Sequence, residues 1–99
     1  MKPKQLNELL KKKKALIIDV RESSEFKKSK EKIRGARNIP MGKVFLMHSL
    51  KKLDKKKKTV VMCLYGSRSK IVAKELRKKG YDIERLDGGI KAWLDYIKK

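Results

Sequence analysis

The sequence predicts a single α/β domain in which helices cover both faces of a mainly parallel sheet. Two short apolar runs rich in β-branched residues, Ala15-Leu16-Ile17-Ile18 and Val60-Val61-Met62, are typical of strands buried on both faces, as in parallel sheets. Stretches with helical periodicity alternate with such runs, which indicates a three-layer α/β/α arrangement. A chain of 99 residues has room for one domain, so residues 1–99 are expected to form one core.

Each expected element has a local signature. Apolar residues spaced three and four apart, such as Leu6, Leu9 and Leu10, indicate helices, and short β-branched runs indicate strands. Ser23 or Ser24 is expected to cap the second helix. In chain order, we expect a helix over residues 4–13, a strand over 15–20, a short helix ending at 30, a strand over 36–39, a helix within 44–53, a strand over 59–63, a helix over 67–79, a strand over 83–86 and a closing helix over 90–97.

Three further features receive a structural interpretation. Gly80 is expected to end the helix before it, and Gly88-Gly89 to form a tight turn. Trp93 lies in an apolar stripe and is expected in the core. No residue pairs His48 with a nucleophile in the sequence, so we interpret it as a surface or helix histidine.

The basic charge is large and concentrated in lysine runs. Lys plus Arg number 30 against 11 Asp plus Glu, which gives a net charge of +19. Lys11–Lys14 and Lys55–Lys58 each precede a strand, so both are expected at the amino ends of the sheet, while ligands bind at the carboxyl ends. A strand of about five residues spans about 17 Å, twice the Debye length of about 8 Å. We therefore interpret the runs as a solvated surface, and a nucleic-acid partner stays open as the alternative.

Several classes of site are excluded by what the sequence lacks. Cys63 is the only cysteine, which rules out an intrachain disulfide, a CxxC pair and a cysteine-built metal centre. With one histidine as well, no metal or other cofactor is expected. No apolar run approaches the roughly 20 residues of a membrane span, and Met1-Lys2-Pro3-Lys4 does not resemble a signal peptide. We expect a cytoplasmic protein without a membrane partner.

Cys63 is the candidate nucleophile. It stands at the end of a buried strand and begins a loop that leads directly into a helix, so unpaired helix amides and the positive end of the helix dipole are expected to face its sulfur. Such a loop holds oxyanions and stabilises a thiolate. A lone cysteine at a strand end is otherwise a small, inert core residue, and the loop context favours the functional interpretation. The residues expected to bind substrate are Leu64, Tyr65, Gly66, Ser67, Arg68 and Ser69.

The charge order of the following helix supports an anion site. A helix is stabilised by acids in its first turn, yet this one begins with Arg68 and Lys70 and has its only acid at Glu75. The arrangement is unfavourable for the helix and favourable for a bound anion. Arg68 can donate two hydrogen bonds to such an anion, which lysine does less well.

Taken together, these residues resemble the rhodanese family in its single-domain form. The resemblance extends from about Leu9 to Tyr96 and is carried by four motifs in the family's order. They are Asp19-Val20-Arg21 with Glu25-Phe26, then Ile33-Arg34-Gly35-Ala36-Arg37-Asn38-Ile39-Pro40, the loop Cys63-Leu64-Tyr65-Gly66-Ser67-Arg68-Ser69, and Leu86-Asp87-Gly88-Gly89 with Ala92-Trp93.

The resemblance implies a five-stranded parallel sheet and an enzyme that transfers sulfane sulfur. By analogy, the Cys63 thiolate attacks the outer sulfur of thiosulfate, sulfite leaves, and the resulting persulfide passes to cyanide, a thiol or a protein acceptor. Arg68 would meet the anionic donor, and Arg21 and Glu25 would form a structural ion pair near the rim. The family often has a basic residue where this chain has Leu64, so a polysulfide or protein persulfide stays open as the donor. It also often has a histidine where this chain has Lys32, a difference that we interpret as structural.

Two other classes of function compete with a sulfurtransferase. A phosphatase or arsenate reductase would also use a cysteine, an anion loop and an arginine, but four residues separate Cys63 from Arg68 here, against five in the phosphatase pattern. No second cysteine is present to resolve an arsenate intermediate. The other candidate is a persulfide carrier or regulatory module that docks through its basic surface, for instance to RNA.

Overall fold

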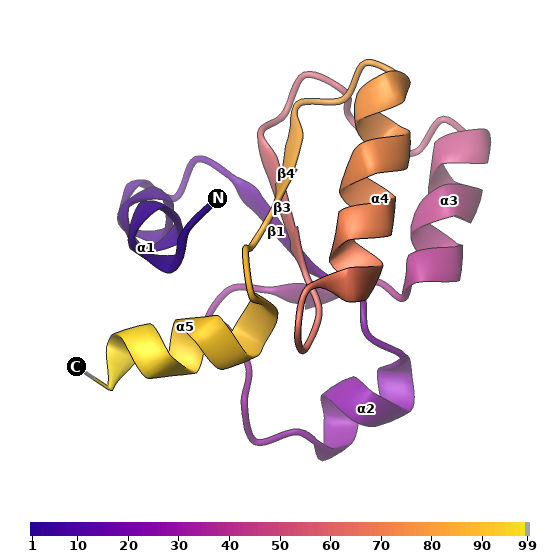
Figure 1. Cartoon of the computed structure of the whole chain (residues 1–99). Helices are drawn as coiled ribbons and strands as arrows, with labels where there is room; N and C mark the ends of the chain where they lie inside the picture. The colour runs from indigo at the N-terminus through magenta and orange to yellow at the C-terminus, as the bar shows by residue number, and fades with distance from the viewer. Residues whose placement is uncertain (99) are drawn as a thin grey trace.

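Four parallel strands form the centre of the molecule in the order β2-β1-β3-β4, with helices on both sides (Figure 1). They are seen in a computed structural model that describes residues 1–98. The prediction of a three-layer α/β/α fold with a parallel sheet is confirmed. The elements are α1 (Pro3–Lys12), β1 (Leu16–Asp19), α2 (Ser23–Lys28), β2 (Arg37–Asn38), α3 (Met41–Ser49), β3 (Thr59–Met62), α4 (Ser67–Lys78), β4 (Ile83–Arg85) and α5 (Gly89–Ile97).

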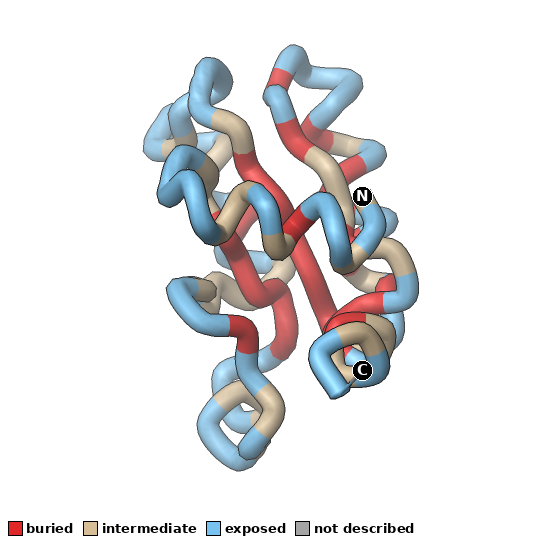
Figure 2. The backbone as a smooth tube through the Cα atoms, turned by 90° about the vertical axis from the view of Figure 1, so that its left-hand side faces the viewer, coloured by how far each residue is buried: buried red, intermediate tan, exposed pale blue. Residues whose placement is uncertain are grey.

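The core lies on both faces of the sheet, because the side chains of the central strands alternate between them. Val61 of β3 packs on one face with residues of α3 and α4, such as Val44 and Val72. Val60 packs on the other face with α1 and α5, where Trp93 is 7% exposed, as predicted for a core residue. Figure 2 shows the strands as the buried centre of the molecule, with exposed segments around them.

The sheet has four strands in the described part of the chain, not the five that the family resemblance implied. The patterns in the sequence itself predicted these four. At the free edge of β4, Met1 donates its amino hydrogen to Arg85 O (2.8 Å) and accepts a hydrogen bond from Asp87 N (2.8 Å). Met1 therefore makes the hydrogen bonds of a neighbouring parallel strand, but one residue does not form a strand.

Some element ends differ from the sequence prediction. The second helix begins after Glu22, so neither Ser23 nor Ser24 is its cap, and both lie inside the first turn. The carboxylate of Glu25 accepts a hydrogen bond from Glu22 N (3.3 Å), which fixes this earlier start. The third helix ends at Ser49 and does not reach Leu53. Gly80 follows the end of α4 with a φ of 91°, as expected for a helix stop.

Both lysine runs lie at the amino ends of the strands, as predicted. Lys11–Lys14 precede β1 and Lys55–Lys58 precede β3, and these two strands are neighbours. Leu16 N donates to Lys58 O at 2.8 Å, so the sheet itself brings the two runs together. Within residues 1–98, no helix is long and apolar enough to cross a membrane.

Candidate active site

Cys63 lies directly after β3, at the carboxyl end of a central strand. The sulfur is recessed, since the residue is only 1% exposed. β1 ends alongside, with Asp19 in register with Met62, so the segments that follow the two strands emerge next to each other. The position is the one that the sequence predicted, in the crevice region of a parallel sheet.

The loop after Cys63 turns its backbone amides toward the sulfur. Gly66 N donates a hydrogen bond to Cys63 Sγ at 3.0 Å. Gly66 is the N-cap of α4 and has a φ of 107°, a left-handed conformation that favours glycine. A Cβ on Gly66 would also lie 3.2 Å from Arg85 Nη1. Glycine at this position therefore allows the sharp turn that aims α4 at the sulfur.

Ser69 completes the polar surroundings of the cysteine. Its side chain is fully buried and lies 3.6 Å from the sulfur, with the thiol donating to Ser69 Oγ. Ser69 Oγ in turn donates to Gly66 O at 3.2 Å, so the serine also holds the turn. The hydroxyl can rotate, which allows it to donate to the sulfur once the thiol has lost its proton.

The surroundings lower the pKa of the Cys63 thiol. Burial raises the pKa, because it disfavours the charged thiolate. Hydrogen bonds from the Ser69 amide and hydroxyl, and from the amides of Gly66 and Arg68, favour the thiolate and outweigh the effect of burial. The site therefore makes the thiolate, the nucleophilic form, easier to reach than it is in a free cysteine.

The first turn of α5 fixes the other side of the loop. Ile90 N donates to Cys63 O (3.0 Å) and Lys91 N donates to Leu64 O (3.1 Å), which keeps these two carbonyl groups turned toward α5. Gly89 permits the approach, because a Cβ on it would lie 2.5 Å from Leu64 O. From the sequence, Gly88-Gly89 was expected only to form a tight turn. The pair of glycines before a helix was the available signal for this close contact.

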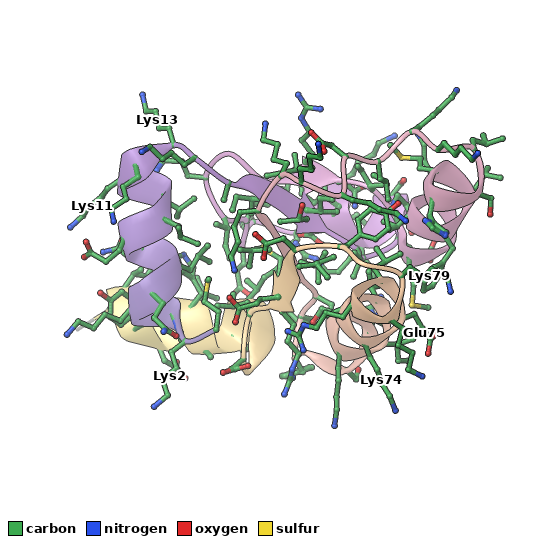
Figure 3. All side chains as sticks on the ribbon, turned by 90° about the horizontal axis from the view of Figure 1, so that it is seen from above. Lys2, Lys11, Lys13, Lys74, Glu75 and Lys79 are labelled. Carbon is green, nitrogen blue, oxygen red and sulfur yellow. The ribbon has the colours of Figure 1, made fainter. Side chains whose placement is uncertain are left out.

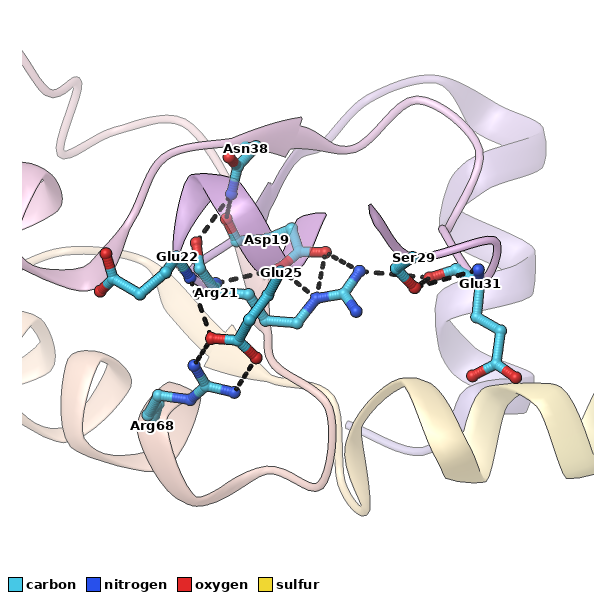
Figure 4. Close-up of polar contacts among 8 residues, drawn as sticks. All are labelled: Asp19, Arg21, Glu22, Glu25, Ser29, Glu31, Asn38 and Arg68. Carbon is cyan, nitrogen blue, oxygen red and sulfur yellow. Dashed lines mark hydrogen bonds and ion pairs between the residues drawn. The ribbon is translucent and has the colours of Figure 1, made fainter. Parts of the chain in front are cut away.

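The expected ion pair between Arg21 and Glu25 is absent from the described residues, and this expectation was wrong. Figure 4 shows that Glu25, on α2, instead pairs with Arg68 at the start of α4, with Arg68 Nη2 donating to Glu25 Oε2 at 3.0 Å. The hydrogen bond from Arg68 lowers the pKa of Glu25. Pairing with Glu25 raises the pKa of Arg68, and the nearby sulfur of Cys63 adds to this effect. Arg68 thus lies between the carboxylate and the cysteine.

Arg21 points inward and neutralises a buried carboxylate. Its guanidinium donates to Asp19, with Nη2 to Oδ2 at 2.8 Å, and Asp19 is fully buried (Figure 4). The Asn38 side chain donates to the carbonyl oxygens of Asp19 and Arg21 at 3.1 and 2.9 Å. This network joins the end of β1 to β2, which is a structural role. A buried charge needs a close partner, and this requirement decides the partner of Arg21.

Leu64, Tyr65 and Ser67 belong to the predicted loop around the cysteine. Within residues 1–98, their side chains make no hydrogen bond to the sulfur. Tyr65 is 67% exposed and Ser67 is also exposed, while Leu64 is half-buried. His48 lies in α3, and its Nδ1 is 2.7 Å from Tyr81 Oη, in agreement with its predicted structural role. Within the same part of the chain, no cluster of three His, Cys, Asp or Glu side chains is present that would hold a metal ion.

The fold is a parallel α/β sheet, and the site is one cysteine in a loop lined by backbone amides. Such an arrangement is typical of proteins that use a cysteine beside a bound anion. Comparison with known proteins identifies the family. The model of the Rhodanese-like domain matches residues 2–96. The chain therefore belongs to the rhodanese-like family, and the resemblance seen in its motifs is confirmed.

Individual relatives agree with this assignment. A putative sulfurtransferase of Bacillus subtilis, YtwF, is 36% identical over 77 residues, which cover 78% of this chain and 71% of the relative. Thiosulfate sulfurtransferase GlpE of Pseudomonas putida is 32% identical over 92 residues, 92% of this chain and 80% of the relative. The crystal structure of a rhodanese-related protein from Thermoplasma volcanium superposes with a TM-score of 0.80 at 30% identity, covering 97% of this chain and 90% of that one.

Proposed function

We propose that the protein is a sulfurtransferase that carries sulfane sulfur on Cys63. In the first half-reaction, the Cys63 thiolate attacks the outer sulfur of thiosulfate, or of a polysulfide or persulfide. A sulfur–sulfur bond forms on Cys63 while the donor's own bond breaks, and sulfite or a thiolate leaves with the electron pair. In the second half-reaction, cyanide or a thiol attacks the outer sulfur of the persulfide, and the Cys63 thiolate is restored.

The observation that carries this proposal is the ring of donors around the sulfur. The Gly66 amide is 3.0 Å from Sγ, and Ser69 and Arg68 contribute further backbone donors that lower the pKa of Cys63. These groups stabilise the attacking thiolate. A persulfide places its negative charge one atom further out, so the same amides are available to it. Relatives that carry the name sulfurtransferase support the same chemistry.

The charge near the mouth of the site determines how an anionic donor is held. Arg68 already pairs with Glu25, so its positive charge is largely neutralised there. Leu64 follows the cysteine and adds no charge. Backbone amides are therefore the main anion-binding groups, and Arg68 contributes to the extent that it leaves Glu25. This arrangement serves a polysulfide or persulfide as well as thiosulfate.

Mass spectrometry of the intact protein tests the proposal. Incubation with thiosulfate or polysulfide is expected to add one sulfur atom, which cyanide or excess thiol then removes. Cys63→Ser is expected to abolish the gain in mass, whereas the control variant Ser49→Ala, at an exposed serine of α3, is expected to retain it. Cys63 is the only cysteine, so no disulfide within the chain discharges the persulfide.

The same experiment separates the competing functions. No added sulfur with any donor, together with hydrolysis of an aryl phosphate, would replace the proposal with a phosphatase. Sulfur that is taken up but released only to a specific protein would identify a carrier. Transfer to cyanide at a catalytic rate supports the enzyme.

A further inference from the structure

The parallel topology gathers lysines at the end of the molecule opposite Cys63. α1, α3 and α4 each end there, because the chain passes from them to the amino ends of β1, β3 and β4. Lysines stand at all three of these helix ends and in the segments that follow. We define the amino-end face by Lys11–Lys14, Lys51, Lys52, Lys55–Lys58, Lys78 and Lys79.

This face is far more basic than the two lysine runs alone. Besides the two runs, the fold brings the lysines that follow α3 and those at the end of α4 to this face. Figure 3 looks down on the molecule from above and shows Lys11 and Lys13 projecting from α1, with Lys79 beyond the end of α4. Among residues 1–98, all lysines of the amino-end face except Lys11, Lys58 and Lys78 make no ion pair.

A groove at the edge of this face combines positive charge with an apolar floor. It has a volume of about 500 Å³ and lies between α1, β1 and the segment that precedes β2. Its charged lining residues are Lys11, Lys13 and Arg34, and no acidic residue lines it. The apolar part of its lining is formed by Leu9, Leu10, Ala15 and Ile17.

We propose that the amino-end face binds single-stranded nucleic acid. Lysines without ion pairs neutralise successive phosphates and release condensed counterions, which is the main source of affinity in such complexes. The groove receives an unpaired base on its apolar floor, with the flanking phosphates beside Lys11, Lys13 and Arg34. A single strand offers charges and exposed flat bases together, and this combination matches the groove and the face.

The shape of the face favours nucleic acid over the other acidic partners. Anchoring to a membrane surface is strengthened by apolar side chains that project from the basic face. Leu50, beside Lys51, projects in this way and is 54% exposed, but the apolar residues between Lys11, Lys13 and Arg34 line a groove, which suits a flat base better than a lipid surface. An acidic peptide would supply charge without a flat ring for the groove. Anionic membranes and acidic peptides are therefore alternatives for the test.

Binding of a fluorescent 20-nucleotide uridine oligomer to the full chain tests the proposal. Lys12→Gln, Lys13→Gln, Lys56→Gln and Lys57→Gln in one variant are expected to weaken binding about tenfold or more. The slope of log K against log salt is expected to fall by about 0.7 for each lost phosphate contact, up to about 3. The matched control carries Lys27→Gln, Lys28→Gln, Lys30→Gln and Lys43→Gln, at exposed positions in and after α2 and in the first turn of α3.

The affinity of the control variant is expected to differ less than twofold from that of the unmodified protein, although both variants lose four lysines and have the same net charge. Equal losses in both variants would overturn the proposal, because binding would then follow overall charge. Tighter binding to polyglutamate or to vesicles rich in anionic lipid would also overturn it. Inorganic polyphosphate of matched charge is expected to bind more weakly than the oligomer, because it has no base for the apolar floor of the groove. Equal affinity for the two polymers would overturn the binding of a base in the groove.

Discussion

At the carboxyl end of the sheet Arg21 and Arg68 are paired with carboxylates, whereas on the amino-end face most lysines make no ion pair among the described residues. Asp19 pairs with Arg21, and Glu25 pairs with Arg68. The positive potential around Cys63 therefore comes mainly from backbone amides of α4. The lysine-rich surface and the cysteine site therefore lie at opposite ends of the molecule. In a parallel sheet the helices begin at the carboxyl end, beside Cys63, and end at the amino end, beside the lysines.

The largest effect is expected where a buried pair at the carboxyl end is broken. Arg21→Ala leaves the buried Asp19 carboxylate without a charged partner, since among the described residues only the backbone amide of residue 21 still donates to it, and is expected to lower the free energy of unfolding by about 3–5 kcal/mol. Arg68→Ala removes a pair that is partly exposed, at 31% and 39% for its two side chains, and is expected to cost less than about 1 kcal/mol. Urea denaturation measures both variants. Equal losses would show that the two arginines do not differ in structural role.

A second stability effect tests the contact between α5 and the cysteine loop. Gly89→Ala places a Cβ 2.5 Å from Leu64 O at a φ of 68°, and is expected to cost about 2–4 kcal/mol and to abolish sulfur loading. Gly42→Ala is the control, since no atom lies within 4 Å of its added Cβ and Gly42 is helical. That change is expected to stabilise by up to about 1 kcal/mol. A Gly89→Ala variant as stable as the control would contradict the close approach.

The reactivity of Cys63 tests the amide-based field. The hydrogen bonds to the sulfur lower its pKa, so the thiolate is present at pH values below about 8.5, the ordinary value for a cysteine. Ser69→Ala removes one donor and is expected to reduce alkylation by iodoacetamide at pH 7 by about five- to tenfold. Ser49→Ala is the control, because Ser49 is an exposed residue of α3 whose side chain donates to Phe45 O. Titration of the unmodified thiol at or above about 8.5 would remove this part of the account.

A smaller effect is expected when Glu25 no longer competes for Arg68. Glu25→Gln frees the guanidinium for an anionic donor and is expected to lower the KM for thiosulfate about threefold. Glu8→Gln makes the same change in charge on α1, away from the site, and is expected to leave the KM unchanged. A raised KM in Glu25→Gln would show instead that Glu25 holds Arg68 in its binding position.

The Glu25–Arg68 pair also has a definite pH dependence. The pKa of Glu25 is lower in the folded protein than the usual value of about 4.3, because Arg68 donates hydrogen bonds to its ionised form. The pair therefore contributes stability fully above about pH 4.3 and loses it as the pH falls through the lowered pKa. In Glu25→Gln this loss is expected to disappear, which acid denaturation monitored by circular dichroism measures.

The smallest effect is expected from the amino end. Lys55→Gln, Lys56→Gln and Lys57→Gln together are expected to change kcat/KM for thiosulfate less than twofold, because these side chains lie about two Debye lengths from the cysteine. Lys58 is left in place, since it pairs with Glu84 at 2.8 Å. Arg68→Ala is expected to lower kcat/KM clearly. A loss in the triple variant equal to that in Arg68→Ala would break the distinction between the two ends.

The features that local sequence predicts are those set by a few neighbouring residues. The order of strands and helices, the loop after Cys63 and the turn at Gly66 followed from apolar runs and from glycine. The partners of Arg21 and Arg68 did not. Arg21 and Glu25 are four residues apart, whereas Glu25 and Arg68 meet only because β1 and β3 pair and place α2 beside the start of α4.

Contacts between backbone atoms were equally hidden. The glycine pair before α5 signals a close approach, but nothing in the local pattern identifies the carbonyl groups of Cys63 and Leu64 as the acceptors. That contact depends on where β4 ends relative to β3, which the pairing register sets. The family resemblance likewise implied a fifth strand, where the described chain has the single residue Met1.

The recessed position of Cys63 limits which molecules can reach its sulfur. The cysteine is 1% exposed, and forming a disulfide requires two sulfur atoms to approach to about 2.05 Å. Two copies of the chain cannot bring two recessed sulfurs that close while both loops keep their conformation. A small anion such as cyanide can approach the recessed sulfur, whereas the recessed thiol of a second folded chain cannot. The same depth that shapes reactivity therefore also protects the cysteine from being lost as a covalent dimer in oxidising surroundings.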